Sequence, residues 1–395
     1  YTRTAPSGWS LGGFVGRSIR DRDLKQFNTG TGLNSKASDW LVSASAAYDD
    51  RLSLVSRTLF DDQVNLSRSE SILRWRGDRH ALLACGDGAP SHAFGRMYEA
   101  LDMQGRAPRL PQPPYHMMSR VVSVSTRPDA PQAGACVVTE YDVPEDAWYF
   151  ADGGNGMMPF AVLLEVALQP CGWLGSHGGF ALLGGECFRN LDGEATLGRG
   201  VGAVAQRILV EARMTRFSTM GTMTIVHFDV VVDSSLGHRV MTLQTSFGFF
   251  PMAALDRQVG LDTGERQRSM RRLPATRWPV DDARSLLPAG RMRMVDGVDF
   301  FEPSGGQAGL GLVRGYQDVD PYAWYFKAHF YQDPVQPGSL GLDALLQLLL
   351  RAVVLKGLTR DVRDPQVRFI SPERALRWSY RGQVTPGARR VTLVV

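Results

Sequence analysis

Two apolar helices, the first with a polar pair one turn apart, are the strongest elements that the hydrophobic pattern predicts. Residues 159–173 form a continuous apolar stretch in which Glu165 and Gln169 would lie on one helical face. A second helix is expected from about residue 338 to residue 355. Alternating positions predict strands at residues 135–143, 208–214, 223–232, 240–250 and 310–316. The pattern therefore indicates a long helix against an antiparallel sheet, with a second helix further along the chain.

The first hundred residues have a weaker pattern. Residues 1–60 are rich in Gly, Ser, Asp and Arg, which is typical of a linker or a partly ordered lead-in. Apolar segments at 72–76 and 81–85 flank a Gly77-Asp78 turn and predict a β-hairpin. A cluster of prolines between residues 108 and 114 then marks a boundary. We expect residues 1–104 to be an N-terminal linker or accessory region.

An internal repeat divides the remaining chain. Asp-Val followed by Ala-Trp-Tyr-Phe occurs at residues 142–150 and returns at residues 318–326. Downstream, Leu-Glu at 164–165 corresponds to Leu-Asp at 342–343, so Glu165 and Asp343 occupy equivalent positions. We expect a first unit at residues 105–275 and a second at residues 276–395.

The two predicted units differ in two respects. Between the aromatic box and the following proline, the second unit contains His329, whereas the first contains no histidine. The second unit also shows no counterpart of the strands at 208–250, so its sheet is expected to be incomplete at the C-terminal end. Either the chain was cut from a longer multienzyme, or other strands complete the sheet.

Composition excludes several classes of function. The net charge of +4 over 395 residues is slight and the arginines are scattered, which argues against nucleic-acid binding. The four cysteines are widely spaced, without histidines at metal-ligand spacing, so neither a disulfide framework nor a zinc site is expected. No signal peptide or uninterrupted apolar run of about 18 residues predicts membrane insertion. We expect a cytoplasmic enzyme region.

The segment His-Phe-Tyr-Gln-Asp-Pro-Val-Gln-Pro-Gly-Ser-Leu-Gly-Leu-Asp at 329–343 resembles the active-site segment of the β-hydroxydecanoyl-acyl-carrier-protein dehydratases. Residues 288–295 resemble the opening of that family, and residues 382–386 resemble a strand that leads into its later sheet. Together with residues 164–173 and 188–191, the paired units resemble the dehydratase didomains of polyunsaturated fatty acid synthases. The resemblance covers roughly residues 105 to 395.

This resemblance implies an α+β double hot-dog fold, in which an antiparallel sheet wraps a long central helix, twice. It implies dehydration of 3-hydroxyacyl thioesters on acyl carrier protein inside a polyunsaturated fatty acid or polyketide-type synthase, beside neighbouring synthase domains. Isomerisation of the trans-2 double bond to cis-3 and a homodimer are left open. No cofactor is needed for either reaction, and a mildly basic surface could receive an acidic carrier protein.

The candidate residues suit this chemistry. A neutral imidazole at His329 could take the proton beside the carbonyl, and a carboxylic acid in apolar surroundings could protonate the leaving hydroxyl. At the start of the second helix, Pro337 and Gly338 would present a free backbone amide to the developing oxyanion. Substrate-binding or orienting roles are also expected for the glutamines one turn after each carboxylate, Gln169 and Gln347.

The choice of carboxylate is the sharper question. In the dimers of the resembled family, the histidine of one subunit works with the carboxylate of the other. We therefore expect His329 to work with Glu165 of the first unit. Asp343 would then face residues 151–156, where no base exists, and is either catalytic in some respect or a structural remnant.

Two alternatives to a dehydratase compete with this interpretation. Thioesterases of the hot-dog fold lack the order of histidine, Pro-Gly and carboxylate found here. A catalytically idle double hot-dog that binds carrier protein or scaffolds a multienzyme is compatible with the missing histidine of the first unit. The presence of both His329 and Glu165 favours the enzyme.

Overall fold

The computed structural model describes residues 2–4, 9–21, 36–48, 52–75, 82, 84–103, 107–256, 265–278, 287–363 and 374–395. The chain divides into two compact units. One consists of residues 1–78 with 120–125, and the other of residues 79–119 with 126–395. The unit with both long helices thus includes residues 84–103, upstream of the predicted boundary at residue 104.

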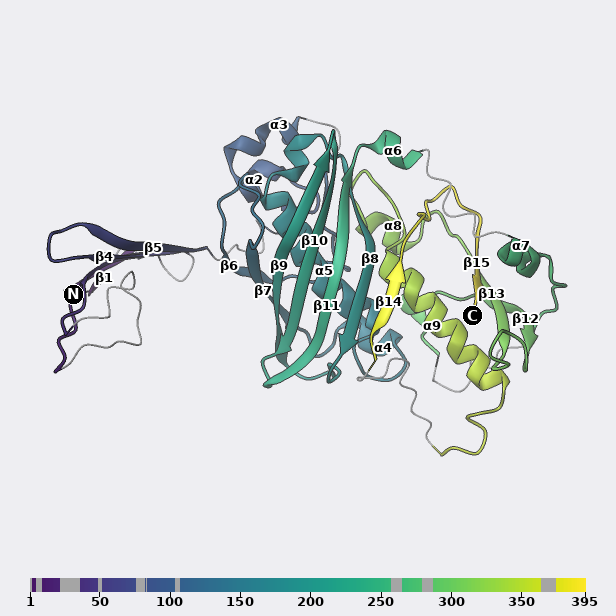
Figure 1. Cartoon of the computed structure of the whole chain (residues 1–395). Helices are drawn as coiled ribbons and strands as arrows, with labels where there is room; N and C mark the ends of the chain where they lie inside the picture. The colour runs from purple at the N-terminus through teal and green to yellow at the C-terminus, as the bar shows by residue number, and fades with distance from the viewer. Residues whose placement is uncertain are drawn as a thin grey trace. The chain divides into compact units, whose positions relative to one another are not determined.

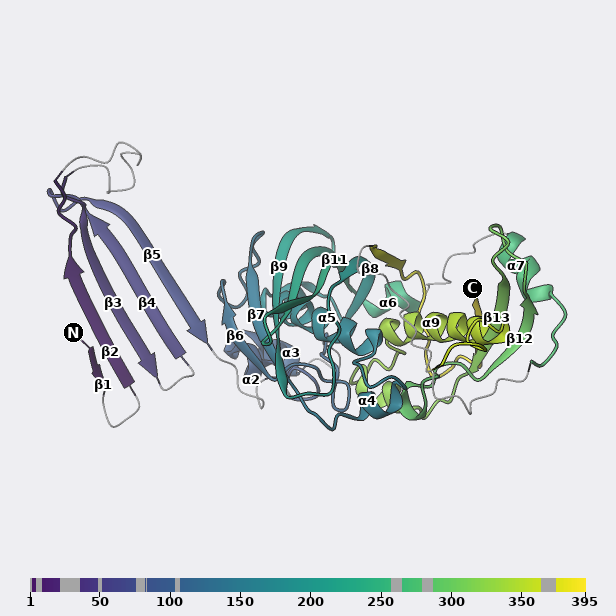
Figure 2. The ribbon, with the colours of Figure 1, turned by 90° about the horizontal axis from the view of Figure 1, so that it is seen from below.

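The N-terminal unit contains an antiparallel sheet with the strand order β1-β2-β3-β4-β5. Its strands are β1 (Thr2–Thr4), β2 (Trp9–Gly16), β3 (Trp40–Tyr48), β4 (Leu52–Phe60) and β5 (Leu66–Trp75), and β6 (Arg120–Val124) is grouped with the same unit. Figure 2 shows the five strands as a meander in chain order.

This sheet corrects two expectations from the sequence. The described parts of residues 1–60 are largely strand rather than linker, because small Ser, Ala and Gly residues pair across β2 and β3 without a strong apolar alternation. The predicted hairpin at 72–85 is wrong in its second arm. Residues 72–75 belong to β5, which pairs with β4, whereas Leu82 and Ala84 are helical. The predicted Gly77-Asp78 turn lies outside the described residues.

The first hot-dog is built around α5 (Phe160–His177), which packs against β7, β9 and β10. In the second compact unit, consecutive neighbours in its larger sheet follow the order β14-β8-β11-β10-β9-β7. These strands are β7 (Cys136–Val143), β8 (Cys187–Leu197), β9 (Gln206–Met220), β10 (Met223–Ser234), β11 (His238–Phe250) and β14 (Leu376–Ser379). Figure 1 shows α5 behind this sheet. Residues 161–175 of the helix are all buried, which explains its continuous apolar sequence.

The second hot-dog is built around α9 (Gly338–Leu355), which packs against β13 and β15 and against α5. Its sheet has the order β12-β13-β15, with β12 (Gly297–Glu302), β13 (Leu312–Asp318) and β15 (Arg390–Val394). In sequence, β14 lies between β13 and β15, but it belongs to the larger sheet. There it pairs with β8, and Trp378 lies opposite Gly193. The described part of the second sheet is therefore smaller than the first.

Short helices complete the described structure. They are α2 (Pro90–Phe94), α3 (Glu99–Asp102), α4 (Trp148–Asp152), α6 (Met252–Asp256), α7 (Glu265–Arg272) and α8 (Trp324–Ala328), with 3-10 turns at Arg96–Tyr98, Phe180–Leu183 and Gly290–Met292. The repeated aromatic boxes fall on α4 and α8 and contact each other. The rings of Trp148 and Trp324 lie edge to face with centroids 5.3 Å apart. The sequence repeat is therefore also a structural repeat.

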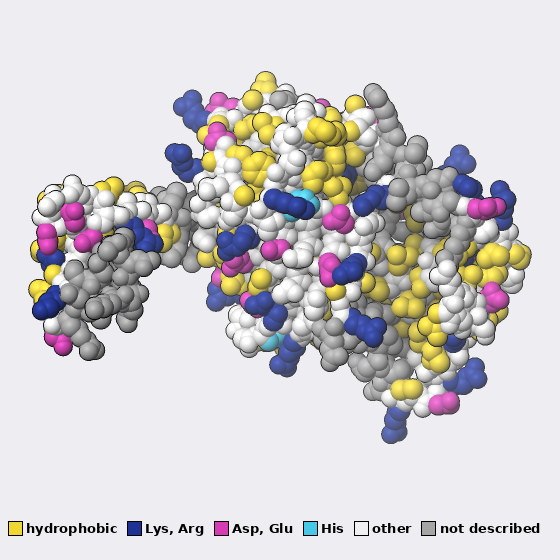
Figure 3. Space-filling model, in the orientation of Figure 1, with side chains coloured by type: hydrophobic (Ala, Val, Ile, Leu, Met, Phe, Trp, Pro, Cys, Tyr) yellow, Lys and Arg dark blue, Asp and Glu magenta, His cyan; other side chains and the backbone are white. Residues whose placement is uncertain are grey.

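Most predicted elements are confirmed. The second predicted helix coincides with α9, the first with most of α5, and the predicted strands with β7, β9, β10, β11 and β13. The strand predicted at 382–386 is wrong, because these residues form a loop between β14 and β15. Neither β8 nor β12 was predicted from alternation. In Figure 3, Lys and Arg side chains are scattered over the visible face.

Candidate active site

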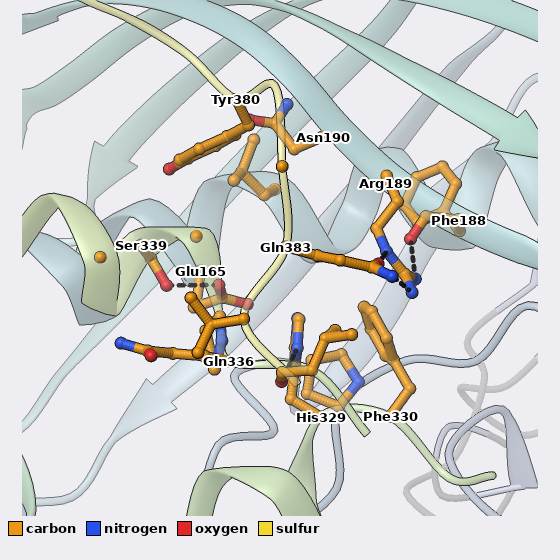
Figure 4. A pocket seen from close by; sticks show the side chains of 18 of the residues that line it. Glu165, Phe188, Arg189, Asn190, His329, Phe330, Gln336, Ser339, Tyr380 and Gln383 are labelled. Atoms are coloured by element: carbon orange, nitrogen blue, oxygen red, sulfur yellow. Dashed lines mark hydrogen bonds between the residues drawn. The ribbon is translucent and has the colours of Figure 1, made fainter. Parts of the chain in front are cut away.

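The expected acid and base line one cavity between the two helices. Its volume is about 250 Å³, and its wall includes Glu165, Gln169, His329, Pro337 and Gly338. Figure 4 shows His329 and Glu165 from different hot-dogs, together with Ser339, Arg189 and Tyr380. Asp343 and Gln347 are not among the lining residues of this cavity. The structure thus brings five of the seven predicted residues together.

His329 follows directly after α8. Its backbone amide donates to the carbonyl of Tyr325 at 2.9 Å, and its Nδ1 lies 3.1 Å from the carbonyl oxygen of Val335. A proton on Nδ1 satisfies this carbonyl and leaves Nε2 as the acceptor. Burial lowers the pKa of His329 to about 3, and the positive charge of Arg189 contributes in the same direction. The imidazole is therefore neutral near pH 7.

An ion pair fixes the loop after His329. Arg189 of β8 donates to both carboxylate oxygens of Asp333, each at 2.7 Å, and also to Gln383 at 3.2 Å. The side chains of Arg189 and Asp333 are only 13% and 14% exposed, so solvent screens the pair weakly. The Asp-Pro of the sequence motif thus anchors the histidine loop to the first sheet. The sequence indicated residues 188–191 only through a resemblance and gave no role for Arg189.

Glu165 lies in the second turn of α5 and is held by both hot-dogs. Its Oε1 accepts a hydrogen bond from Ser339 at 2.7 Å, and its Oε2 accepts one from Gln169 at 3.2 Å. Burial raises the pKa of Glu165 to about 7, although both hydrogen bonds lower it. Near neutral pH a large fraction of this carboxyl therefore carries a proton.

Ser339 is a site residue that the sequence did not single out. Its hydroxyl lies 3.1 Å from the hydroxyl of Tyr115 and donates to Glu165. Because the serine proton is used toward Glu165, the Tyr115 hydroxyl donates, and it shares its proton between Ser339 at 3.1 Å and the carbonyl oxygen of Ala161 at 3.5 Å. The resulting series runs from Tyr115 through Ser339 to Glu165, and it crosses between hot-dogs twice. The only signal in the sequence was a polar residue just after Pro-Gly.

Gly338 is the first residue of α9, after Pro337 at the N-cap. Backbone amides of the first turn have no partner within their own helix, so they can donate to a ligand. A Cβ on Gly338 would lie 2.6 Å from Cζ of Tyr380. Glycine is therefore required here by the close approach of the Tyr380 ring.

Asp343 has the same local arrangement on α9 but lies outside the cavity lining. Gln347 donates to Asp343 at 2.5 Å and to the carbonyl of Met292 at 2.7 Å, and its oxygen accepts from the amide of Met294 at 2.9 Å. Burial raises the pKa of Asp343 to about 6. Both polar groups of the Gln347 amide are thus engaged with protein atoms, which argues for orienting the carboxylate rather than binding substrate.

Gln169 repeats this pattern in the first hot-dog. Its oxygen accepts from the amide of Met117 at 2.7 Å, and its nitrogen donates to the carbonyl of Tyr115 at 2.8 Å as well as to Glu165. Each glutamine therefore ties its carboxylate to the segment that precedes the sheet. Gln169 lines the cavity, but its hydrogen bonds also serve to position Glu165.

In the first hot-dog, Gly153 takes the place of His329. The backbone N–H of Gly153 donates a hydrogen bond to the carbonyl oxygen of Tyr149 at the end of α4. The backbone N–H of His329 donates the equivalent bond to Tyr325 at the end of α8. A Cβ on Gly153 would lie 2.7 Å from the carbonyl oxygen of Tyr149 and 2.9 Å from Cγ of Pro159. An imidazole does not fit at this position without rearrangement of the loop.

The position of Gly338 is also changed in the first hot-dog. Phe160 follows Pro159 at the start of α5, where Gly338 follows Pro337 at the start of α9. The large ring of Phe160 packs against Trp378, with centroids 6.4 Å apart. The first hot-dog therefore lacks both a histidine at the position of His329 and a small residue at the helix start. That Asp343 faces residues 151–156 stays a prediction.

Two general features of the described residues bear on the site. They contain no group of three His, Cys, Asp or Glu residues that could hold a metal ion. By length and composition, α9 could cross a membrane. It is, however, the core helix of the second hot-dog, and Asp343, Gln347 and Arg351 are buried on it. Three buried polar side chains indicate a helix that packs inside a protein.

The fold and the site together place this chain in the class of double hot-dog proteins whose two halves share one cavity. The chain has an α+β double hot-dog fold, with a histidine from one hot-dog and a carboxyl from the other on one cavity. Residues 287–395 match the FabA-like domain. A polyunsaturated fatty acid synthase chain of Thraustochytrium sp. (strain ATCC 26185 / S-3) is 29% identical over 341 residues. The alignment covers 77% of this chain and 22% of that relative, so the chain spans about a fifth of its length.

Solved structures give more distant likenesses. A dehydratase structure described for substrate selection in the borrelidin and fluvirucin polyketide synthases is 14% identical, with a TM-score of 0.38, and covers 73% of this chain and 86% of that one. The E. coli PaaI protein is 9% identical, with a TM-score of 0.25, and covers 33% and 78%. The resemblance to the dehydratases of polyunsaturated fatty acid synthases is confirmed by the family match and the synthase relative.

Proposed function

We propose that this chain dehydrates 3-hydroxyacyl thioesters on acyl carrier protein to 2-enoyl products, within a polyunsaturated fatty acid or polyketide-type synthase. The observation that carries the proposal is the shared cavity of His329 and Glu165. A neutral imidazole and a protonated carboxyl are the base and the acid that elimination needs. With a pKa of about 3 for His329 and about 7 for Glu165, both groups are neutral between these pH values.

In the proposed reaction, Nε2 of His329 takes the proton from C2 of the substrate, beside the thioester carbonyl. The electron pair forms the C2–C3 double bond as the C3–O bond breaks, and Glu165 gives its proton to the departing oxygen, which leaves as water. Each group of this kind typically contributes about 10²- to 10⁴-fold in rate. The hydrogen bonds from Ser339 and Gln169 then stabilise the carboxylate that Glu165 becomes.

Charge on the thioester oxygen rises while the C2 proton is removed. The amides of the first turn of α9 would donate to this oxygen, and the partial positive charge of the helix N-terminus would add to their effect. Gly338 has no side chain, which leaves room for the Tyr380 ring beside the start of α9. Pro337 has no amide proton of its own and fixes the direction in which the helix starts.

The partners follow from the same proposal. The synthase relative is a long chain of which this one matches about a fifth, so neighbouring synthase domains and an acyl carrier protein are the expected partners. We also propose a cytoplasmic location, together with that synthase. The idle-scaffold alternative is not favoured, because a scaffold gives no reason to bury Glu165 and His329 on one cavity.

The test is incubation with a 3-hydroxyacyl thioester, followed by the absorbance of the 2-enoyl product. The natural sequence should turn over, and His329→Ala should lose the reaction while it retains its fold by circular dichroism. An unchanged rate in His329→Ala would refute the proposal. Absence of turnover by the chain joined to its synthase neighbours would favour the scaffold instead.

A further inference from the structure

Tyr380 carries a buried hydroxyl group without a hydrogen-bond partner. The residue follows β14, and its backbone amide donates to the carbonyl of Leu191 at 2.7 Å, which fixes it against the first sheet. Its ring covers Gly338, and the residue lines the cavity with Glu165. In Figure 4, Glu165 is drawn between Tyr380 and His329. A polar group on the wall of the proposed active site is therefore left unsatisfied.

Other buried tyrosine hydroxyls of the described residues are satisfied. Tyr98 donates to the carbonyl of His177 at 2.8 Å, Tyr115 pairs with Ser339, and the hydroxyls of Tyr141 and Tyr149 lie 3.1 Å apart. Because a buried hydroxyl without a partner destabilises the fold, such groups in native proteins call for a reason. Catalytic sites are one place where they are retained.

The electrostatics of Tyr380 connect it with Glu165. Burial and, after it, the charge of Glu165 hold the pKa of the Tyr380 phenol well above its usual value, so the group stays a hydrogen-bond donor. Both oxygens of Glu165 already accept bonds, from Ser339 and from Gln169. Tyr380 and Glu165 line the same cavity, and the Tyr380 hydroxyl makes no hydrogen bond to the carboxyl.

We propose that the Tyr380 hydroxyl donates a hydrogen bond to the 3-hydroxyl oxygen of the substrate, the atom that receives the proton of Glu165. This inference rests on the proposed function and deepens it. The hydroxyl oxygen has two lone pairs, of which Tyr380 takes one and the acid proton of Glu165 the other. As the C3–O bond breaks, the oxygen gains electron density, so the bond from Tyr380 strengthens and water leaves more readily.

A binding measurement tests the contact without catalysis. The ligands are two pantetheine amides of equal chain length, one with a 3-hydroxyacyl group and one with the acyl group that lacks this hydroxyl. Calorimetry on the natural sequence should show tighter binding of the hydroxylated ligand. Tyr380→Phe should reduce this preference by roughly three- to tenfold, the value of one hydrogen bond, and should leave the affinity for the unhydroxylated ligand unchanged.

Thermal unfolding supplies the second readout, with Tyr141→Phe as a matched control. Tyr380→Phe removes an unpaired hydroxyl, so its melting temperature should equal or exceed that of the natural sequence. Tyr141→Phe breaks the pair with Tyr149, so it should melt lower and keep the ligand preference. A lower melting temperature of Tyr380→Phe would show that its hydroxyl is already bonded, which would overturn the inference.

The remaining outcomes are also distinguishable. If both ligands bind equally less well to Tyr380→Phe, the residue acts on the thioester or on packing, and the 3-hydroxyl contact is wrong. If the natural sequence dehydrates its substrate and Tyr380→Phe keeps both the rate and the preference, only this inference fails. If neither ligand binds the natural sequence, the proposed function fails and the inference with it.

Discussion

Isosteric substitution of the two buried carboxyls separates the catalytic role of Glu165 from that of its counterpart Asp343. Glu165→Gln keeps the shape of the side chain but cannot give up a proton. We expect it to lower the rate of dehydration by about 10²- to 10⁴-fold. Asp343 lies outside the cavity lining, so Asp343→Asn should leave the rate unchanged.

The effect on stability is expected to be the same for both substitutions. Burial raises the pKa of Glu165 from 4.5 to about 7 and that of Asp343 from 3.8 to about 6. Each group therefore takes up a proton more readily in the folded than in the unfolded chain. Stability from this source is fully present below the unfolded pKa and is lost as the pH rises through the folded one. At pH 8 each ionised carboxyl destabilises the fold by about 3 kcal/mol.

Replacement by the neutral amide removes this penalty. Urea unfolding at pH 8 should therefore show both variants to be more stable than the natural sequence, by up to about 3 kcal/mol, and the gain should disappear near pH 4. Dehydration measured on the same samples should be lost only in Glu165→Gln. Loss of activity in Asp343→Asn with full activity in Glu165→Gln would show that the assignment across the two hot-dogs is wrong.

Three further predictions concern the surroundings of the site. Dehydration should fall as the pH rises through about 7, because Glu165 loses its proton. The hydrogen bond from Ser339 lowers the pKa of Glu165, so Ser339→Ala should raise this pKa and move the fall to higher pH. A pH–rate profile that does not move contradicts the assignment of Glu165 as the acid. Gly338→Ala should destabilise the fold by about 1–3 kcal/mol, because the new Cβ would meet the Tyr380 ring. Gly341→Ala on the same helix should not destabilise it, because no atom lies within 4 Å of a Cβ at that position. Denaturant unfolding of the two variants measures the difference. Arg189→Gln should destabilise the fold by about 1.5–3 kcal/mol, because the partly buried Asp333 carboxylate loses its charged hydrogen-bond partner. A melting temperature equal to that of the natural sequence would show that the pair does not hold the loop.

Local sequence was sufficient for much of this fold. The predicted bounds of α9 agree with the observed ones, and those of α5 nearly do. Each helix is a long apolar stretch whose backbone hydrogen bonds join residues only four positions apart, so its local sequence is sufficient to predict it. The repeat placed Glu165 and Asp343 at equivalent positions, and the motif indicated His329. Predictions of this kind succeed because they depend on periodicity and spacing within a few turns.

Only the tertiary structure decided which residues meet. The bond between Ser339 and Glu165 joins residues 174 positions apart, and the bonds between Arg189 and Asp333 join residues 144 positions apart. Three further features also depend on tertiary packing. They are the pairing of β14 with the larger sheet, the packing of Tyr380 on Gly338, and the position of Asp343 outside the cavity lining. No local sequence pattern predicts these contacts, because the residue type is the same whether the side chain faces a cavity or a neighbouring strand. Sequence alone thus determined the chemistry available in each half, and the packing of one half against the other determined which groups form the site.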